Sequence, residues 1–288
     1  MQVIAAAGLL FQTAPRDPVL ASRIQQLLHT FLLTDDPGDN ARTAAQEIVR
    51  TRGLVSVDEV GDDAAYALVL LTCSPEVSIL ARQAAERNEV PEDAAALCEA
   101  HLRQKEVQTE YDKRRPDRPS LRDRIEVLFK ADQSVRQRNS DIRAMVKTDA
   151  RLKAELEAIF AKYGVPTFAM VGPSAASHFV VMVQHQSPEF RRRALPKLKA
   201  NVDAGQADPA SFAMVYDRTQ TDSGSKQLYG ENFTCDAAHP KLHVGPIEDE
   251  EHVDQRRAQL GMFRLALYAE VLNATSPDVC SGVAAAPK

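Results

Sequence analysis

The sequence predicts a mainly α-helical protein made of two homologous helical units, the second of which carries a short β-hairpin or ordered loop. Three observations lead to this fold class. A segment near residue 50 recurs near residue 160, apolar residues repeat with helical spacing along most of the chain, and helix start signals follow both copies of the segment. We therefore expect an internal duplication.

The recurring segment occupies residues 48–71 in the first copy and 159–185 in the second. Two glycines, an Ala-Ala pair and an apolar run keep their order in both copies, and each copy then reaches Ser-Pro-Glu, at Ser74 and at Ser187. Such an ordered series is not expected by chance. The predicted division is an apolar N-terminal segment and candidate signal remnant (1–18), a degenerate helical repeat (19–112), a linker (113–119), a helical domain with a polar site (120–275) and a flexible tail (276–288).

Local signals place the helices in order along the chain. In each copy Ser-Pro-Glu supplies an N-cap residue, a first-turn proline and an acid near the positive end of a helix dipole. The next helix starts at Pro91 in the first copy and at Asp208 in the second. The rest of the second copy is expected to contain an amphipathic helix that stops at Gly164 (151–162), a buried apolar helix (175–186), a hairpin or ordered loop (227–247) and a last helical segment (254–272).

The charge balance argues against a sequence-independent nucleic-acid binder. The net charge is -5 and the pI is near 5.8, whereas such proteins carry a surplus of Lys and Arg. Basic clusters at 113–115 and 191–193 lie beside acidic residues, and we interpret them as solvated helix faces. No apolar run approaches the length of a bilayer span, so no membrane-spanning segment is expected.

The four cysteines, two in each half of the chain, show no spacing typical of a metal site or a Cys-x-x-Cys motif. Buried free thiols are the favoured interpretation, and one disulfide in each half is the alternative for a protein outside the cytosol. The apolar opening, residues 3–14, has two interpretations as well: the tail of a secretory signal or a frayed first helix. The compartment is left open between cytoplasmic and extracytoplasmic.

The polar residues at the end of the buried helix are the first candidates for a functional site. His178 and His185 are two helical turns apart and project from one face, and Gln184 precedes His185. One interpretation is a capping histidine, because the last turn of a helix has free carbonyl groups and the negative end of the dipole. The first copy has neither histidine nor glutamine at the matching positions, 71–74, which favours a functional role.

Further polar residues are concentrated in the second copy. Asp217 and Arg218 are adjacent and cannot face each other on a helix, so Asp217 is a natural partner to orient His185. Surface salt bridges or helix caps are the alternative for each residue taken singly. The other members of the expected cluster are Asp132, Gln133 and Arg136 on one helical face, Gln227 and Tyr229 at the start of the hairpin, and Arg257 in the last helix.

Taken together, these residues belong to a series of motifs. In chain order the series is Asp132-Gln133-x-x-Arg136, Gly164-x-Pro166, Val171-Gly172, Gln184-His185, Asp217-Arg218, Gln227-x-Tyr229-Gly230, Pro246-Ile247 and Asp254-x-x-Arg257-x-x-x-Gly261. Over about residues 124–268 it resembles an uncharacterised bacterial family of unknown function, number 6624, preceded here by the degenerate copy. The chain departs from the family pattern at Val165, where the family has Trp, and at Glu231-Asn232, where it has Thr-Gln. The resemblance implies a helical fold and a polar cluster, and no assigned reaction.

Two functions of different classes fit this cluster. In the first, an acid–base enzyme acts on a small polar or anionic substrate, with His185 and Asp217 as catalytic residues and the others as substrate-binding residues: Gln184, Arg218, Gln227, Tyr229, Asp132, Gln133, Arg136 and Arg257. In the second, a noncatalytic module binds a small ligand or a partner protein, and the cluster is a structural network. A cleft open to solvent beside His185 favours chemistry or ligand binding, and a sealed network favours a structural role.

No metal or other cofactor is expected. His239 and His243 have i, i+4 spacing, but nearby prolines deny them a helix, and no HExxH motif is present. A zinc site would have to combine His185 with one of these two histidines. The oligomeric state is left open, since an internal duplication supplies the pseudo-symmetric contact that a dimer would otherwise give.

Overall fold

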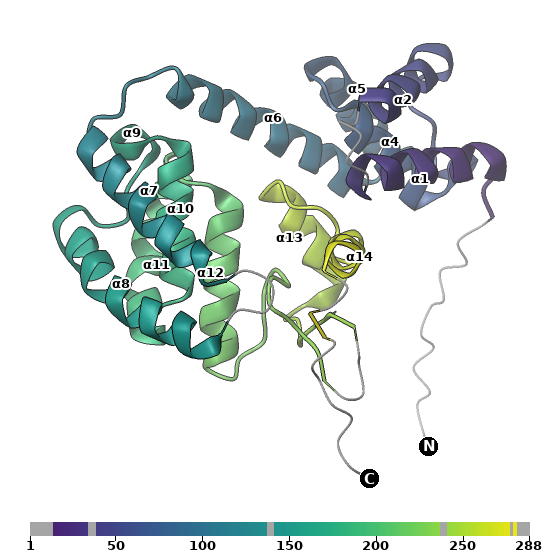
Figure 1. Cartoon of the computed structure of the whole chain (residues 1–288). Coiled ribbons are helices and arrows are strands. Elements are labelled where there is room, and N and C mark those ends of the chain that lie inside the picture. The colour runs from purple at the N-terminus through teal and green to yellow at the C-terminus, as the bar shows by residue number, and fades with distance from the viewer. Residues whose placement is uncertain (1–13, 34–38, 137–140, 237–240, 277–278, 281–288) are drawn as a thin grey trace, which may run out of the picture. The chain divides into compact units, whose positions relative to one another are not determined.

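The computed structural model describes residues 14–33, 39–136, 141–236, 241–276 and 279–280, and it divides into two compact units, Met1–Glu99 and Ala100–Lys288 (Figure 1). The mainly α-helical prediction is confirmed. The boundary between the units falls within the long helix α6 (Glu92–Asp112), whereas the sequence placed a linker just after that helix. Each unit has its own buried core.

Unit 1 is organised around one apolar helix, α4, whose residues 64–72 are all buried. Helices α1 and α2 pack against it. The predicted helix start at Ser74 is confirmed, because its hydroxyl accepts a hydrogen bond from the Val77 amide at 3.2 Å. The helices that precede α6 are α1 (Pro18–Leu33), α2 (Asp39–Arg52), α3 (Val57–Val60), α4 (Asp62–Thr72) and α5 (Pro75–Glu86).

Unit 2 is built around α10, which corresponds to the predicted buried helix and is packed against α7, α9, α11 and α12. Phe179 and Met182 on α10 are fully buried. Helix α8 begins earlier than the predicted residue 151, because Asp141 caps it by accepting the Arg143 amide at 2.9 Å. The helices are α7 (Pro119–Ser134), α8 (Ile142–Tyr163), α9 (Phe168–Val171), α10 (Pro173–Gln184), α11 (Pro188–Asp203) and α12 (Pro209–Asp222).

The C-terminal part of unit 2 confirms the predicted hairpin and corrects the last helix. Strands β1 (Phe233–Thr234) and β2 (His243–Val244) pair antiparallel. The expected helical segment 254–272 is interrupted by residues in extended and turn conformations, including Gly261 at φ +72. The Asp254 carboxylate accepts the Leu265 amide at 2.7 Å and so starts a new helix. The resulting elements are η1 (Glu250–His252), α13 (Val253–Gln259) and α14 (Leu265–Thr275).

The order of helices α1 to α6 parallels that of α7 to α12. In each series a four-residue helix ends at a glycine that starts the buried helix. Gly61 has φ 82 and ψ 163, and Gly172 has φ 82 and ψ 161, so the two turns have the same backbone conformation. These positive φ values favour glycine. The duplication itself stays a prediction, and this shared order supports it.

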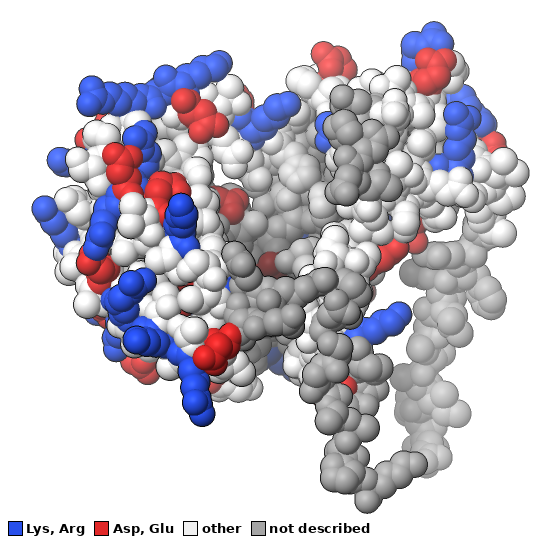
Figure 2. Space-filling view, viewed as in Figure 1, with Lys and Arg blue, Asp and Glu red and all other residues white. Residues whose placement is uncertain are grey.

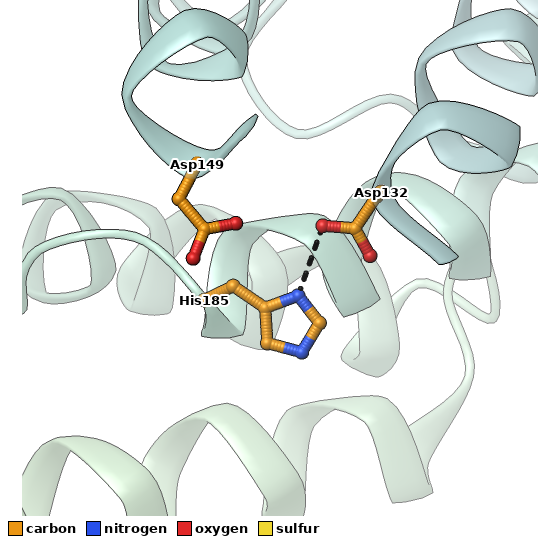
Figure 3. Close-up of side chains that lie close together, drawn as sticks. All are labelled: Asp132, Asp149 and His185. Carbon is orange, nitrogen blue, oxygen red and sulfur yellow. Dashed lines mark hydrogen bonds and ion pairs between the residues drawn. The ribbon is translucent and has the colours of Figure 1, made fainter. Parts of the chain in front are cut away.

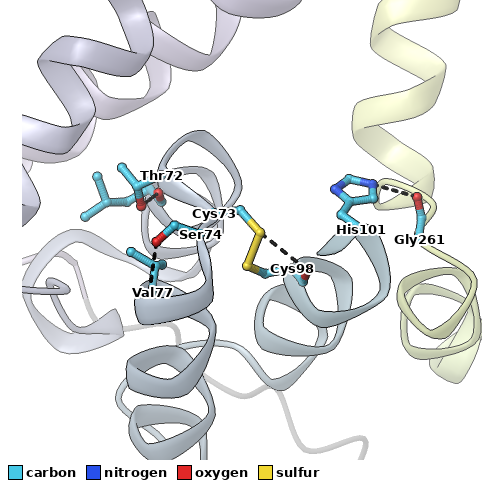
Figure 4. Close-up of a disulfide and its surroundings, with 8 residues drawn as sticks. Thr72, Cys73, Ser74, Val77, Cys98, His101 and Gly261 are labelled. Carbon is cyan, nitrogen blue, oxygen red and sulfur yellow. Dashed lines mark hydrogen bonds between the residues drawn. A yellow bond between two sulfur atoms is a disulfide. The ribbon is translucent and has the colours of Figure 1, made fainter. Parts of the chain in front are cut away.

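Both cysteine pairs form disulfides, Cys73–Cys98 in unit 1 and Cys235–Cys280 in unit 2. The favoured interpretation as free thiols is therefore wrong. The fold brings the paired Cα atoms to 5.5 and 5.7 Å, within the range that a disulfide requires. Figure 4 shows how Cys73–Cys98 joins the turn after α4 to α6.

Several sequence predictions concern chain ends and surface charge. Most of the candidate signal remnant (1–18) and of the tail (276–288) lies outside the described residues. Among the helices that are described, none combines the length and the apolar character needed to cross a bilayer. On the face seen in Figure 2, basic and acidic side chains are interspersed over the region of α7 to α12.

Candidate functional site

A cleft of about 430 Å³ lies at the C-terminal end of α10 in unit 2. The turn between α10 and α11 forms one part of its wall. Helices α8, α11 and α12 and the residues just after α7 contribute charged side chains to the rest. The cleft is lined by Arg136, Asp149, Gln184, His185, Gln186, Pro188, Arg191, Arg218 and Asp222.

His185 follows the last residue of α10 and contacts α7 through its ring. Its Nδ1 lies 3.1 Å from Oδ1 of Asp132, which is fully buried, while the His185 side chain is 21% exposed. A carboxylate only accepts hydrogen bonds, so Nδ1 of the neutral ring carries the proton and Nε2 keeps a free lone pair. Figure 3 shows Nε2 directed away from both nearby carboxylates.

Arg136 links two carboxylates at the floor of this cleft. Its Nη1 lies 3.1 Å from Oδ1 of Asp132 and donates to the Asp132 carbonyl oxygen at 3.0 Å. Its Nη2 donates to Oδ1 of Asp149 at 2.5 Å. Gln133 donates from Nε2 to Oδ2 of Asp132 at 2.7 Å. The buried charge of Asp132 is therefore surrounded by donors, as a buried carboxylate requires.

Arg191 is buried under the turn between α10 and α11. Its Nη1 donates to the carbonyl oxygens of Gln184, at 2.9 Å, and Gln186, and its Nη2 pairs with Asp222. Burial lowers the pKa of Arg191, and the positive charges of Arg218 and Arg192 lower it further. The interpretation of residues 191–193 as a solvated face is wrong for Arg191, which is 3% exposed.

The side chains of Arg218 and Gln184 have hydrogen-bond donors that are available to a bound molecule. The Arg218 side chain is 54% exposed, and its ion-pair contact is a long one, 3.9 Å from Nε to Oδ1 of Asp222. The side-chain amide of Gln184 has no hydrogen-bond partner among the described residues. Both side chains line the cleft and are free to contact a bound molecule.

Asp217 does not orient His185, contrary to the sequence prediction. It is fully buried on the other side of α12, where its carboxylate accepts the backbone amides of Leu228 at 2.8 Å, Tyr229 at 3.1 Å and Glu231 at 2.9 Å. Burial raises the pKa of Asp217, and these amides oppose the shift. Asp132 takes the place beside His185 that was expected for Asp217.

Arg257, Glu231, Tyr229 and Gln227 belong to the same separate network, which holds residues 227–232 in place. Arg257 is 1% exposed and donates to the carbonyl oxygens of Tyr229 and Phe263, both at 2.6 Å, and to Glu231 Oε1 at 2.9 Å. Gln227 Nε2 donates to the Asn232 carbonyl oxygen at 2.9 Å, and Gln227 Oε1 accepts the Asn232 amide at 2.6 Å. We assign this network to the architecture of the loop.

Burial also shifts the acidities within this loop network. It raises the pKa of Glu231, although the charge of Arg257 opposes the shift. It raises the pKa of Tyr229 and that of Tyr268, the latter to about 12. The Arg257 guanidinium lies 4.9 Å from the centre of the Tyr268 ring. A phenol in this setting is neutral at physiological pH.

Two groups that line the cleft and one buried behind it have the spacing to hold a cation. Ligand atoms of Asp132, Asp149 and His185 lie within 4.8 Å of one another. Arg136 already places its guanidinium against both carboxylates, so the donor set is neutralised by a protein cation and fits a metal poorly. Of the other histidines considered as zinc ligands, His239 lies outside the described residues, and His243 faces Asp236 at 3.6 Å.

Residues 119–277, more than half of the chain, match the family of unknown function DUF6624. The chain belongs to this family. No curated protein and no solved structure matches the chain significantly. The DUF6624 match runs from the first residue of α7 to just beyond α14, and it therefore includes both the cleft and the loop network. The degenerate copy that precedes it stays a prediction.

The DUF6624 cleft also contains residues that sequence reasoning missed, namely Asp149, Gln186, Arg191 and Asp222. Asp149 lies on a part of α8 that the sequence did not mark as helical. The helix start at Ser187 was a usable signal for Arg191, because it places that side chain in the first turn of α11, next to residues 184–186. Asp222 is the last residue of α12, one turn after Arg218.

Proposed function

We propose that the cleft is the active site of an acid–base enzyme that acts on a small polar or anionic substrate. The observation that carries this proposal is the hydrogen bond between Nδ1 of His185 and the buried carboxylate of Asp132. Such a pairing selects one tautomer of the ring and leaves Nε2 to accept a proton from a bound molecule. Asp132 is the orienting residue in this proposal, in place of Asp217.

In the proposed reaction, His185 Nε2 removes a proton from a substrate hydroxyl or from a water molecule in the cleft. The carboxylate of Asp132 stabilises the imidazolium that forms, because opposite charges 3.1 Å apart attract strongly where water is excluded. Arg136 and Gln133 hold Asp132 so that the ring keeps its direction. The proton then returns from Nε2 to the product or to its leaving group.

The accessibility of His185 supports chemistry over a sealed structural network. Its ring lines an open cleft, whereas Asp132 behind it is fully buried. His178 offers a comparison on the same helix. Its Nδ1 lies 3.0 Å from Glu126, and its ring is stacked on Phe129 at 3.7 Å, outside the cleft. A histidine–carboxylate pair of the same kind is thus available as an internal control.

The experiment is a turnover screen of small esters, lactones, amides and phosphoesters with wild type, His185→Gln and His178→Gln. General acid–base catalysis contributes about 100-fold or more to a rate, so we expect His185→Gln to lose turnover by that factor. His178→Gln is expected to keep it. Equal turnover in all three proteins would contradict the proposal.

The second candidate is a noncatalytic binding module with a structural polar cluster. What favours it is the way Arg136 joins Asp132 to Asp149, which couples α7 to α8 as a structural ion pair would. Under this alternative, Arg136→Met lowers the melting temperature markedly, and His185→Gln changes neither turnover nor the binding of a small ligand. Thermal unfolding recorded beside the turnover screen separates the two candidates.

A further inference from the structure

The end of the cleft away from Asp132 carries an excess of positive charge. Arg191 and Arg218 both line it, and among the described residues one carboxylate, that of Asp222, forms ion pairs with them. At the other end Arg136 is matched by Asp149 and Asp132. The two arginines repel each other, since the charge of Arg218 contributes to the lowered pKa of Arg191. A bound anion would relieve this repulsion.

Unpartnered donors gather at the same end. Nε of Arg191 and Nε2 of Gln186 have no hydrogen-bond acceptor among the described residues, although both side chains are more than nine-tenths buried and line the cleft. Leaving a buried donor unpaired destabilises a protein, so such groups ordinarily have an acceptor. The amide of Gln184 and the guanidinium of Arg218 add accessible donors beside them.

We propose that the Arg218 end of the cleft binds an oxyanion of the substrate, a carboxylate or a phosphate. Arg218 and Gln184 contact it directly, while Arg191, held by Asp222 and two carbonyl oxygens, is a positioning residue that adds positive charge from behind. Guanidinium groups suit this task, because their planar N–H fork matches the oxygens of either group. This inference rests on the proposed function, since it names the substrate class of the same site.

The test is a binding titration with inorganic phosphate and with acetate at constant ionic strength, followed by NMR shifts of the cleft amides. Sodium chloride is the reference anion. The variant is Arg218→Gln, and the matched control is Arg192→Gln, an exposed neighbour of Arg191 that pairs with Glu189 outside the cleft. Both side chains are about half exposed, so neither substitution is expected to unfold the protein.

We expect wild type to bind at least one of the two oxyanions saturably, and the preferred one identifies carboxylate or phosphate as the chemistry. A charge-assisted contact supplies a tenfold change for each ~1.4 kcal/mol, so Arg218→Gln should weaken binding about tenfold or more. Arg192→Gln should leave it within about twofold. Absence of saturable binding to wild type, unchanged binding to Arg218→Gln, or equal losses in the two variants would overturn the inference.

His185→Gln separates this inference from the proposed function. The inference requires that His185→Gln still binds the oxyanion, while the acid–base proposal requires that it loses turnover. If Arg218→Gln loses oxyanion binding and His185→Gln keeps its turnover, the acid–base role fails and the oxyanion site stands. If His185→Gln is inactive and Arg218→Gln binds as wild type does, the oxyanion site fails and the acid–base role stands.

Discussion

Asp132 illustrates how a buried charge can be both stable and useful. Its carboxylate is fully buried, yet side chains of three residues approach it: His185, Gln133 and Arg136. Removing one partner of such a buried group ordinarily costs several kcal/mol, because the remaining charge loses its compensation. Gln133 and Arg136 hold Asp132, and Asp132 in turn sets the direction of the His185 ring. Stability and site geometry therefore depend on one side chain.

We expect Asp132→Asn to lower turnover by about 100-fold, because a neutral amide stabilises the imidazolium poorly and no longer selects the tautomer. The free energy of unfolding should fall by about 1–3 kcal/mol, the cost of disturbing one buried hydrogen-bond set. The control is Asp123→Asn, an exposed carboxylate on the same helix. Equal turnover in Asp132→Asn and Asp123→Asn would show that Asp132 does not assist His185.

At the scale of elements, the loop 227–232 is held against α12 and α13 by buried polar groups. Asp217 on α12 accepts backbone amides of the loop, and Arg257 on α13 donates to a loop carbonyl oxygen. Gly230 lies in the middle at φ +76. A Cβ there would come within 2.8 Å of the Leu265 side chain, so any larger residue requires Leu265 to shift.

Gly230→Ala should therefore destabilise the protein more than Gly224→Ala does. Gly224 has nearly the same φ, +75, but a Cβ there would meet nothing within 4 Å. Both substitutions lower the free energy of unfolding because alanine is strained at a positive φ. Only Gly230→Ala also creates a steric overlap with Leu265, which should lower it by about 1–3 kcal/mol more. Urea denaturation measures the two free energies of unfolding. An equal loss in both variants would show that Leu265 gives way freely.

The buried carboxyl of Glu231, in the same loop, is expected to make the stability of the protein depend on pH. Burial raises its pKa in the folded protein above the ordinary value of 4.5, so its ionisation costs the folded state stability. This cost is absent below the ordinary value and grows as the pH rises through the raised one. Relative to Glu231→Gln, wild type should be most stable at low pH and lose that advantage towards neutral pH. Urea denaturation of wild type and Glu231→Gln from low to neutral pH measures the two free energies of unfolding. A difference between them that does not vary with pH would contradict the prediction.

At the scale of the whole molecule, the two helical series differ in the turn that follows the buried helix, α4 in one and α10 in the other. In unit 1 the turn after α4 contains Cys73, which is bonded to Cys98 on α6. In unit 2 the matching position, the end of α10 and the turn after it, carries Gln184 and His185 and borders the cleft. A disulfide joins the turn after α4 to α6, whereas polar side chains at the end of α10 line a cleft. A duplication followed by divergence would give this arrangement.

The Cys73–Cys98 bond is expected to stabilise unit 1 by about 3 kcal/mol, because it closes a loop of moderate length in the unfolded chain. Cys73→Ala/Cys98→Ala should lower the transition temperature of unit 1, and the transition of unit 2 should stay where it is. Differential scanning calorimetry resolves the two if they unfold separately. An unchanged thermogram would show that the bond adds nothing to folding.

Local signals were enough to predict most helices, because N-caps, prolines and glycines act within a few residues of where they stand. Ser74, Ser187 and Asp208 begin helices as expected. The interruption at Gly261 was missed, since it depends on the capping of Leu265 by a distant Asp254. The interpretation of the cysteines as free thiols was wrong because separation in sequence does not report distance in space.

Local signals in the sequence also predicted part of the candidate site. Gln184 and His185 were marked by their position at the end of a buried helix, and Arg136 by its helical spacing from Asp132. Asp217 was assigned to the wrong partner because adjacent helical residues point about 100° apart, and only Arg218 of that pair faces the cleft. The loop whose backbone amides bind Asp217 reaches it through the tertiary fold, which residue spacing along the sequence does not reveal.

The tautomer of His185 tests the central claim most directly, because the whole site depends on Asp132 accepting a hydrogen bond from the N–H at Nδ1. Long-range proton–nitrogen NMR of the imidazole, assigned with His185→Gln and recorded where the ring is neutral, reports which nitrogen is protonated. We predict protonated Nδ1 and bare Nε2. A ring protonated on Nε2 would mean that Asp132 does not hold it, and would contradict the account.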